Sequence, residues 1–125
     1  MVTLKQEVNR ISQKRVVKSV VSLGLTESEA EVYVHLAKQG SQTAREIAEA
    51  LKTHRQLVYR SLRRLKNRDI VNATAQHPSV YCAIPFDKAL ELLIKAHLKE
   101  SLSIEQQKEE IIDQWRYMTS EQLRL

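Results

Sequence analysis

The stretch TAREIAEALKTHRQLVYRSLRRLKNRDIV, residues 43–71, decides the fold. Its apolar residues recur at helical spacing in two segments, 44–51 and 54–67, which only about two residues separate. Two helices with so short a connection form a helix-turn-helix. The second helix lies within residues 53–68, which contain six Lys and Arg residues and no acid. We therefore expect this segment to attract a polyanion.

Three short segments have the pattern of a helix capping box: Thr26–Glu29, Thr43–Glu46 and Thr53–Gln56. In this motif the Thr hydroxyl accepts a hydrogen bond from the amide three residues later, and the Glu or Gln side chain reaches back to the Thr amide. We expect each box to begin a helix, and the first of these helices to span about 27–38. Tyr33 in this helix is expected to be a core residue.

After the basic helix the hydrophobic pattern alternates with a period of two. Segments 70–75 and 80–84 are predicted to be strands, and residues 76–79 connect them as a β-hairpin. A helix-turn-helix, a basic second helix and then a hairpin follow one another in a winged helix-turn-helix. We predict this fold, mainly α with a small β-hairpin, for a domain of residues 1–86 that begins with a helix over 4–23.

The remaining residues, 87–125, are predicted to form a C-terminal dimerisation helix over about 88–118, with Asp87 as its N-cap. It would be roughly 45 Å long at about 1.5 Å per residue, too long to pack along so small a domain. Its apolar residues would be an aggregation hazard on one monomer, so we expect it to pair with a second copy, together with the 4–23 helix. Packing back on its own domain is the alternative. The residues expected to dimerise, on an imperfect coiled-coil seam, are Leu90, Ile94, His97, Ile104, Ile111 and Trp115.

A lone helix fits the major groove of duplex DNA, and Lys and Arg beside it meet phosphates. Arg55 and Gln56, in the first turn of the basic helix, are the best candidates for reading bases, since Arg pairs with guanine and Gln with adenine. The amides near Thr43 could hold a phosphate, and Arg45 would add charge there. The full set of expected DNA contacts is Thr43, Arg45, Thr53, His54, Arg55, Gln56, Tyr59, Arg60, Arg63 and, at the wing tip, His77 and Ser79.

The sequence also resembles a known family over roughly residues 20–96. Its segments LGLTESEAEVYVHLAKQGSQTAREIAEAL (23–51), THRQLVYRSLRRLKNRDIV (53–71) and PSVYCAIPFDKALELLI (78–94) are similar to the DNA-binding domain of TrmB-like transcriptional regulators. The resemblance implies a dimeric winged-helix DNA-binding protein of a mostly archaeal family. The glycine usual in the family near the start of the wing is replaced around Arg68-Asp69. Large members carry a C-terminal sugar-binding domain, so we expect DNA binding here and no sugar sensing.

Other function classes find little support in the sequence. No run approaches the roughly 18 apolar residues of a membrane span, so no membrane partner is expected. The N-terminus lacks the apolar core of a signal peptide, and the single Cys82 fits a reducing cytosol, which predicts a cytoplasmic, nucleoid-associated protein. Neither a HExxH pattern nor a glycine-rich phosphate loop is present. We therefore predict no enzyme, no metal site and no cofactor.

Together these features predict a homodimeric, sequence-specific double-stranded DNA-binding transcriptional regulator. Helix 54–67 would enter the major groove, the wing over 71–84 would lie on its flank, and two-fold symmetry would require a palindromic operator. The alternative is a winged-helix adaptor of the transcription machinery that contacts proteins and does not read a DNA sequence.

Overall fold

The computed structural model describes residues 3–122, which divide into two compact units, one ending at Leu93 and the other beginning at Ile94. The fold class is confirmed: the chain is mainly helical and has a small antiparallel sheet. The elements are α1 (Leu4–Ser22), α2 (Glu27–Gln39), β1 (Gln42–Thr43), α3 (Ala44–Leu51), α4 (Arg55–Asn67), β2 (Val71–Ala73), β3 (Val80–Ala83), α5 (Phe86–Gln106) and α6 (Lys108–Gln122).

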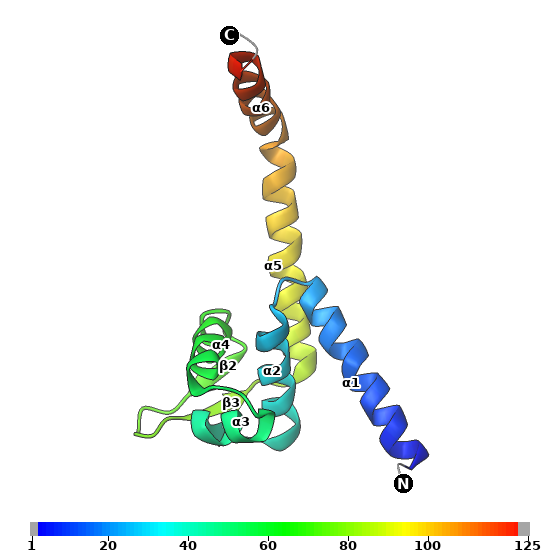
Figure 1. Ribbon diagram of the computed structural model, residues 1–125, viewed down its shortest axis with the longest axis vertical. Helices are drawn as coiled ribbons and strands as arrows, with labels where there is room; N and C mark the ends of the chain where they lie inside the picture. The colour runs from blue at the N-terminus through cyan, green and yellow to red at the C-terminus, as the bar shows by residue number, and fades with distance from the viewer. Residues whose placement is uncertain (1–2, 123–125) are drawn as a thin grey trace. The chain divides into compact units, whose positions relative to one another are not determined.

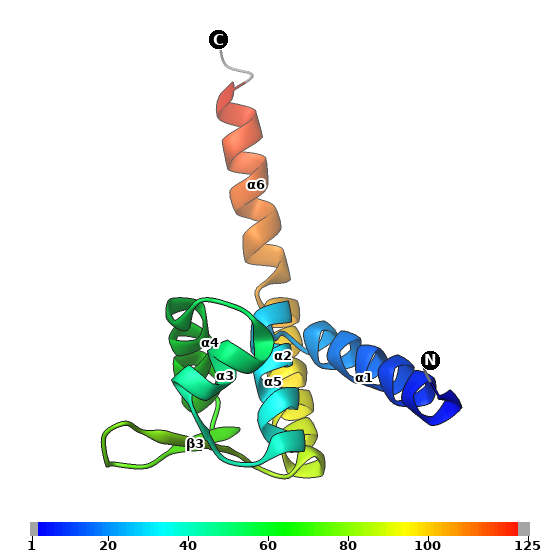
Figure 2. The same cartoon turned by 60° about the horizontal axis from the view of Figure 1, so that its bottom comes forward.

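The first unit is organised around α2, which lies between α1 and α4 (Figures 1 and 2). Tyr33 of α2 is a core residue, as expected, and only 1% of it is exposed. Its hydroxyl donates a hydrogen bond of 2.7 Å to the carbonyl oxygen of Ile84, at the end of the sheet. Burial, and to a lesser extent the negative charge of Asp87, raise the pKa of Tyr33 to about 12. The other fully buried large side chains are Val20, Leu36, Ile47, Val58, Leu62, Leu65, Ile70 and Val71.

The capping boxes at Thr26 and Thr43 form as predicted, and a further one forms at Thr3, where α1 begins. The box expected at Thr53 is wrong. Lys52 adopts the left-handed conformation (φ 53°), and the Thr53 amide donates to the Ala48 carbonyl oxygen at 3.0 Å. Thr53 thus completes the end of α3, and His54 is the N-cap of α4 without a side-chain hydrogen bond.

The sheet has the strand order β1-β3-β2. The hairpin of β2 and β3 was predicted, although both strands are shorter than expected, and it projects beyond the helices as a wing (Figures 1 and 2). The third strand, β1, was not predicted, because two residues cannot show an alternating pattern. Gln42 of β1 pairs with Tyr81 of β3, so the segment that precedes α3 is attached to the wing.

The C-terminal helix differs from the prediction of one helix over 88–118. It begins at Phe86, because the Ala89 amide donates to the Pro85 carbonyl oxygen, so Asp87 lies in the first turn and is not the N-cap. Gln107 then separates α5 from α6. Its amide is shared between the carbonyl oxygens of Ser103 and Ile104, at 3.2 and 3.1 Å, which tightens the last turn of α5. No Gly or Pro marks this position in the sequence.

Candidate nucleic-acid interface

Helix α4 separates an apolar face from a cationic one. Val58, Leu62 and Leu65 are at most 1% exposed and hold the helix against α2 and α3. The side chains expected to read or contact DNA lie on the other face, where all are exposed: Arg55, Gln56, Tyr59, Arg60 and Arg63. The helix therefore has the amphipathic pattern predicted for it.

The six cations of residues 53–68 fall into two groups. Two of them bind the protein itself: Arg64 lies 3.8 Å from the buried carboxylate of Glu29, and Arg68 donates to the carbonyl oxygen of Gly24 at 3.2 Å. Glu29 was predicted as a member of a capping box, but neither its burial nor these two contacts was predicted. The capping pattern does not show whether its carboxylate is buried. The other four, Arg55, Arg60, Arg63 and Lys66, are exposed, and none of them has an acidic partner within ion-pair distance among the described side chains.

The start of α3 carries acids next to the expected phosphate contacts. Thr43 Oγ1 accepts from the Glu46 amide at 3.2 Å, and the Thr43 amide donates to the Glu46 carboxylate at 3.0 Å. The hydrogen bonds from the Thr43 amide and then from its hydroxyl lower the pKa of Glu46. Arg45 forms an exposed ion pair of 3.2 Å with Glu49. A phosphate at this helix start would therefore meet two carboxylates besides Arg45, which makes it a weaker anion site than α4.

The remaining residues expected to contact DNA lie in the turn before α4 and in the wing. Thr53 is half-buried and His54 is exposed. His77 is exposed in the wing loop, and Ser79 Oγ donates to the Gln76 carbonyl oxygen at 3.2 Å, so this serine stabilises the loop. Burial, and then the neighbouring Tyr59, raise the pKa of Tyr81 on β3.

The residues expected to dimerise divide between the units. Leu90 is half-buried in the first unit, next to the buried Ala89 and Leu93. In the second unit the large apolar members of the set are 41–63% exposed, and His97 is exposed as well. The exposed apolar members are Ile94, Ile104, Ile111 and Trp115.

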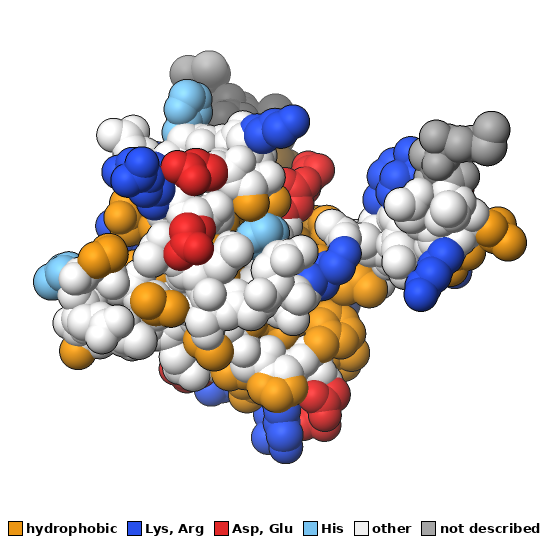
Figure 3. Space-filling view, turned by 90° about the horizontal axis from the view of Figure 1, so that it is seen from below, with side chains coloured by type: hydrophobic (Ala, Val, Ile, Leu, Met, Phe, Trp, Pro, Cys, Tyr) orange, Lys and Arg blue, Asp and Glu red, His pale blue; other side chains and the backbone are white. Residues whose placement is uncertain are grey.

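Helix α1 also exposes apolar side chains. Leu4, Val8 and Ile11 are 82%, 54% and 52% exposed. Figure 3 shows the N-terminal part of α1 standing away from the rest of its unit, with hydrophobic and Lys or Arg side chains on its surface.

Two further properties concern the described part of the chain. Among the side chains that the structure describes, those of residues 3–120, no three His, Cys, Asp or Glu cluster as ligands of a metal ion would. None of the helices within residues 3–122 combines the length and hydrophobicity that crossing a bilayer requires.

The family model described as "Sugar-specific transcriptional regulator TrmB" matches residues 20–87, more than half of the chain. The chain belongs to the TrmB family. This family consists of DNA-binding transcription regulators and not of enzymes, so the chain has the fold and general role of a transcription regulator. Comparison with characterised protein sequences finds no match.

Solved structures with the same fold include regulators of the TrmB and MarR types. TrmBL2, an archaeal chromatin protein, is 19% identical with a TM-score of 0.68, and the match covers 91% of this chain but only 44% of that one. A possible transcriptional regulator from Methanosarcina mazei is 17% identical with a TM-score of 0.59, covering 78% of this chain and 86% of that one. MarR from E. coli is 16% identical with a TM-score of 0.51, covering 98% of both chains. These likenesses establish the winged-helix fold.

Proposed function

We propose that this TrmB-family chain is a homodimeric transcriptional regulator that recognises a specific sequence in double-stranded DNA. The observation that carries the proposal is the exposed face of α4, a helix fixed by a buried apolar stripe. There, no acidic group among the described side chains lies within ion-pair distance of Arg55, Arg60 or Arg63. A rigid helix with cations on its outer face can enter a major groove and neutralise phosphates on both sides of it.

The exposed residues of α4 divide into two roles along the helix. Arg55 and Gln56 lie in its first turn, from which side chains can reach base edges, and we assign them to sequence reading. Tyr59, Arg60 and Arg63 lie further along and are assigned to phosphates. Thr43, Arg45, Thr53 and His54 flank this surface in sequence, and the wing, with His77 and Ser79, lies on the flank of the same groove.

The homodimer rests on exposed apolar side chains. Those of α1, of α5 from Ile94 onward and of α6 are too numerous to be ordinary surface residues of a monomer. We assign residues 1–86 to DNA binding and 87–125 to dimerisation. Two-fold symmetry then requires a palindromic operator, with half-sites about 10 bp apart or a multiple of that. A nucleoid association follows from the same DNA binding.

Selection of bound sequences from a random duplex pool tests sequence reading. We expect a palindromic consensus to emerge, and its affinity to fall steeply with salt on a log–log plot because bound counterions are released. Replacing Arg55 with Ala should relax the consensus at one position, whereas Arg63→Ala should weaken all sequences equally. A pool that stays random, with a partner protein recovered instead, would favour the adaptor function.

Light scattering of the full chain tests the dimer separately. We expect a mass of twice the 14.5 kDa monomer at micromolar concentration. An Ile111→Asp/Trp115→Asp variant places two charges in the exposed stripe and should give a monomer with unchanged helix content. A wild-type monomer at this concentration would contradict the dimer and, with it, the palindrome.

A further inference from the structure

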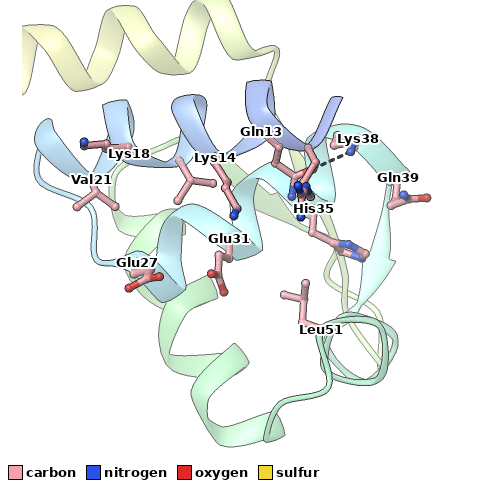
Figure 4. A pocket seen from close by; sticks show the side chains of 12 residues that line it. Gln13, Lys14, Lys18, Val21, Glu27, Glu31, His35, Lys38, Gln39 and Leu51 are labelled. Atoms are coloured by element: carbon pink, nitrogen blue, oxygen red, sulfur yellow. Dashed lines mark hydrogen bonds between the residues drawn. The ribbon is translucent and has the colours of Figure 1, made fainter. Parts of the chain in front are cut away.

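A groove of about 750 Å³ lies between α1 and α2 (Figure 4). Apolar side chains from two elements form part of its wall: Val17 and Val21 of α1, and Leu51 at the end of α3. Polar side chains surround them. This volume is within the range of sites that bind small molecules, about 300–1,000 Å³.

The groove carries a net positive charge. Its carboxylates are those of Glu27 and Glu31, and Lys14 points toward Glu31 (Figure 4). Within residues 3–122 neither Lys14 nor Lys18 has an acidic group within ion-pair distance. The four cations that line the groove are Arg10, Lys14, Lys18 and Lys38.

The cations at one end of the groove are held by neighbours. Arg10 pairs with Glu7 at 2.9 Å, and Lys38 donates to the side-chain oxygen of Gln13 at 2.8 Å. In Figure 4, Gln13, His35 and Lys38 gather at this end, while Val21 lies toward the other, together with Lys18 and Glu27. Cations and apolar side chains that line one groove fit a small molecule that has an anionic group and an apolar body.

DNA bound to α4 cannot neutralise this charge. Helix α1 packs on the side of α2 opposite to α4, as both ribbon views show (Figures 1 and 2). Electrostatic interactions between exposed charges are largely screened beyond about 8–10 Å at physiological salt. Arg10 already pairs with Glu7, whereas Lys14 and Lys18, which have no ion-pair partner among the described side chains, need an anion of their own if they are to be neutralised.

Two residues of the groove connect it to the parts that face DNA. Leu51 directly precedes Lys52, the left-handed residue of the helix-turn-helix. His35 Nε2 lies 2.7 Å from the side-chain oxygen of Gln42, and Gln42 pairs with Tyr81 of the wing. A molecule in the groove touches the end of α3 and, through His35, the strand that holds the wing.

We propose that the groove between α1 and α2 binds a small amphipathic organic anion and that its occupation changes the affinity for DNA. The first part stands on the groove alone, and the second rests on the proposed function. A ligand shifts the DNA affinity only by the difference between its affinities for the two states, so the effect is reciprocal.

Two fluorescent probes of nearly the same shape test the first part. Anilinonaphthalene sulfonate is anionic, and phenylnaphthylamine is its uncharged counterpart. We expect the anionic probe to shift the backbone amide NMR signals of segments 13–21 and 31–39 of the full chain saturably, and the neutral probe to bind these segments more weakly. Equal binding of both probes, or shifts confined to residues 94–122, would overturn the site.

Charge removal sharpens the same test. Lys14→Gln/Lys38→Gln should raise the dissociation constant of the anionic probe about fivefold, because two exposed ion pairs are lost. The matched control is Lys5→Gln, which removes a charge from α1 outside the groove and should leave the constant within about twofold. If the double variant instead changes the mass of the particle in light scattering, the groove is an interface between subunits and the ligand site is refuted.

Duplex titrations test the second part. The anionic probe, at a concentration that saturates the groove, should change the dissociation constant of the selected DNA at least threefold or so in the wild type, and much less in the double variant. An unchanged constant in the wild type refutes the coupling while the NMR result still stands. A chain that binds no duplex at all contradicts the proposed function and leaves the groove result intact.

Discussion

Helices α1 and α4 are both basic and both show apolar residues at helical spacing, yet they use these residues in opposite ways. In α4, Val58, Leu62 and Leu65 are at most 1% exposed. In α1, Leu4, Val8 and Ile11 are more than half exposed, and α1 is held to its unit by Val16, Val17 and Val20. A helix turns by about 100° per residue, so the two apolar sets of α1 lie on different sides of it. The single apolar stripe of α4 is buried and holds the helix in place. Helix α1 has two apolar stripes, of which one packs on its unit and the other is exposed.

The largest expected effect is on stability. Leu62→Ala leaves a cavity in the core and should lower the free energy of unfolding by about 3 kcal/mol. Ile11→Ala removes an exposed side chain and should cost less than about 0.5 kcal/mol in the monomer. Urea denaturation of both variants gives the two values. Repeating it at several protein concentrations separates the effect of Ile11 on a dimer, which depends on concentration, from its effect on the monomer.

The cations of the two helices should also differ in their effect on DNA affinity. Arg60→Ala removes an expected phosphate contact and should weaken duplex binding by about 1 kcal/mol, with the slope of the log–log salt plot reduced by about 1. Arg15→Ala removes the same charge from α1 and should leave both quantities nearly unchanged. Anisotropy titrations across a salt series measure them. Equal losses from the two variants would show that only net charge matters, and would contradict the assignment of α4.

The sequence predicted the elements whose patterns span several turns or strands. The apolar stripe of α4, its cationic face and the hairpin extend over enough residues for a period to be visible. What it missed depends on contacts between distant segments. The strand β1 exists because Gln42 and Thr43 meet β3, and Glu29 is buried because Arg64 lies beside it. Such pairings leave no local pattern.

The candidate nucleic-acid interface could likewise be predicted only in part from the sequence. The exposure of α4 follows from its periodicity, whereas the division of its cations into those bound within the protein and those without acidic partners does not. Asp69 is a second example: its φ is 64°, the left-handed conformation that favours glycine, and no local pattern of the sequence predicted this backbone.

The ends of α1 and α4 provide the next test. Both helices end in a left-handed residue, Gly24 (φ 110°) after α1 and Asp69 (φ 64°) after α4. A Cβ at Gly24 would meet only the Arg68 side chain, at 3.6 Å, so the cost of Gly24→Ala comes from the backbone and should be about 1 kcal/mol. Asp69→Gly should instead stabilise the protein by about 0.5 kcal/mol. Thermal and urea denaturation measure both, and a loss of stability in Asp69→Gly would mean that the aspartate side chain contributes more than its backbone costs.

Substitutions at the N-caps of the two helices should have the smallest effect on stability. Helix α1 begins with a complete capping box at Thr3, whereas His54 at the start of α4 makes no side-chain cap, although its backbone (φ −82°, ψ 142°) already has the N-cap conformation. His54→Ser supplies the missing acceptor for the Leu57 amide and should stabilise the protein by about 0.5 kcal/mol. Thr3→Ala should cost no more than about 0.5 kcal/mol, because a terminal turn is already weakly held. Measuring duplex affinity of His54→Ser alongside its stability is decisive: if stability rises while affinity falls, the imidazole itself contacts DNA, and the absent cap is the cost of placing it there.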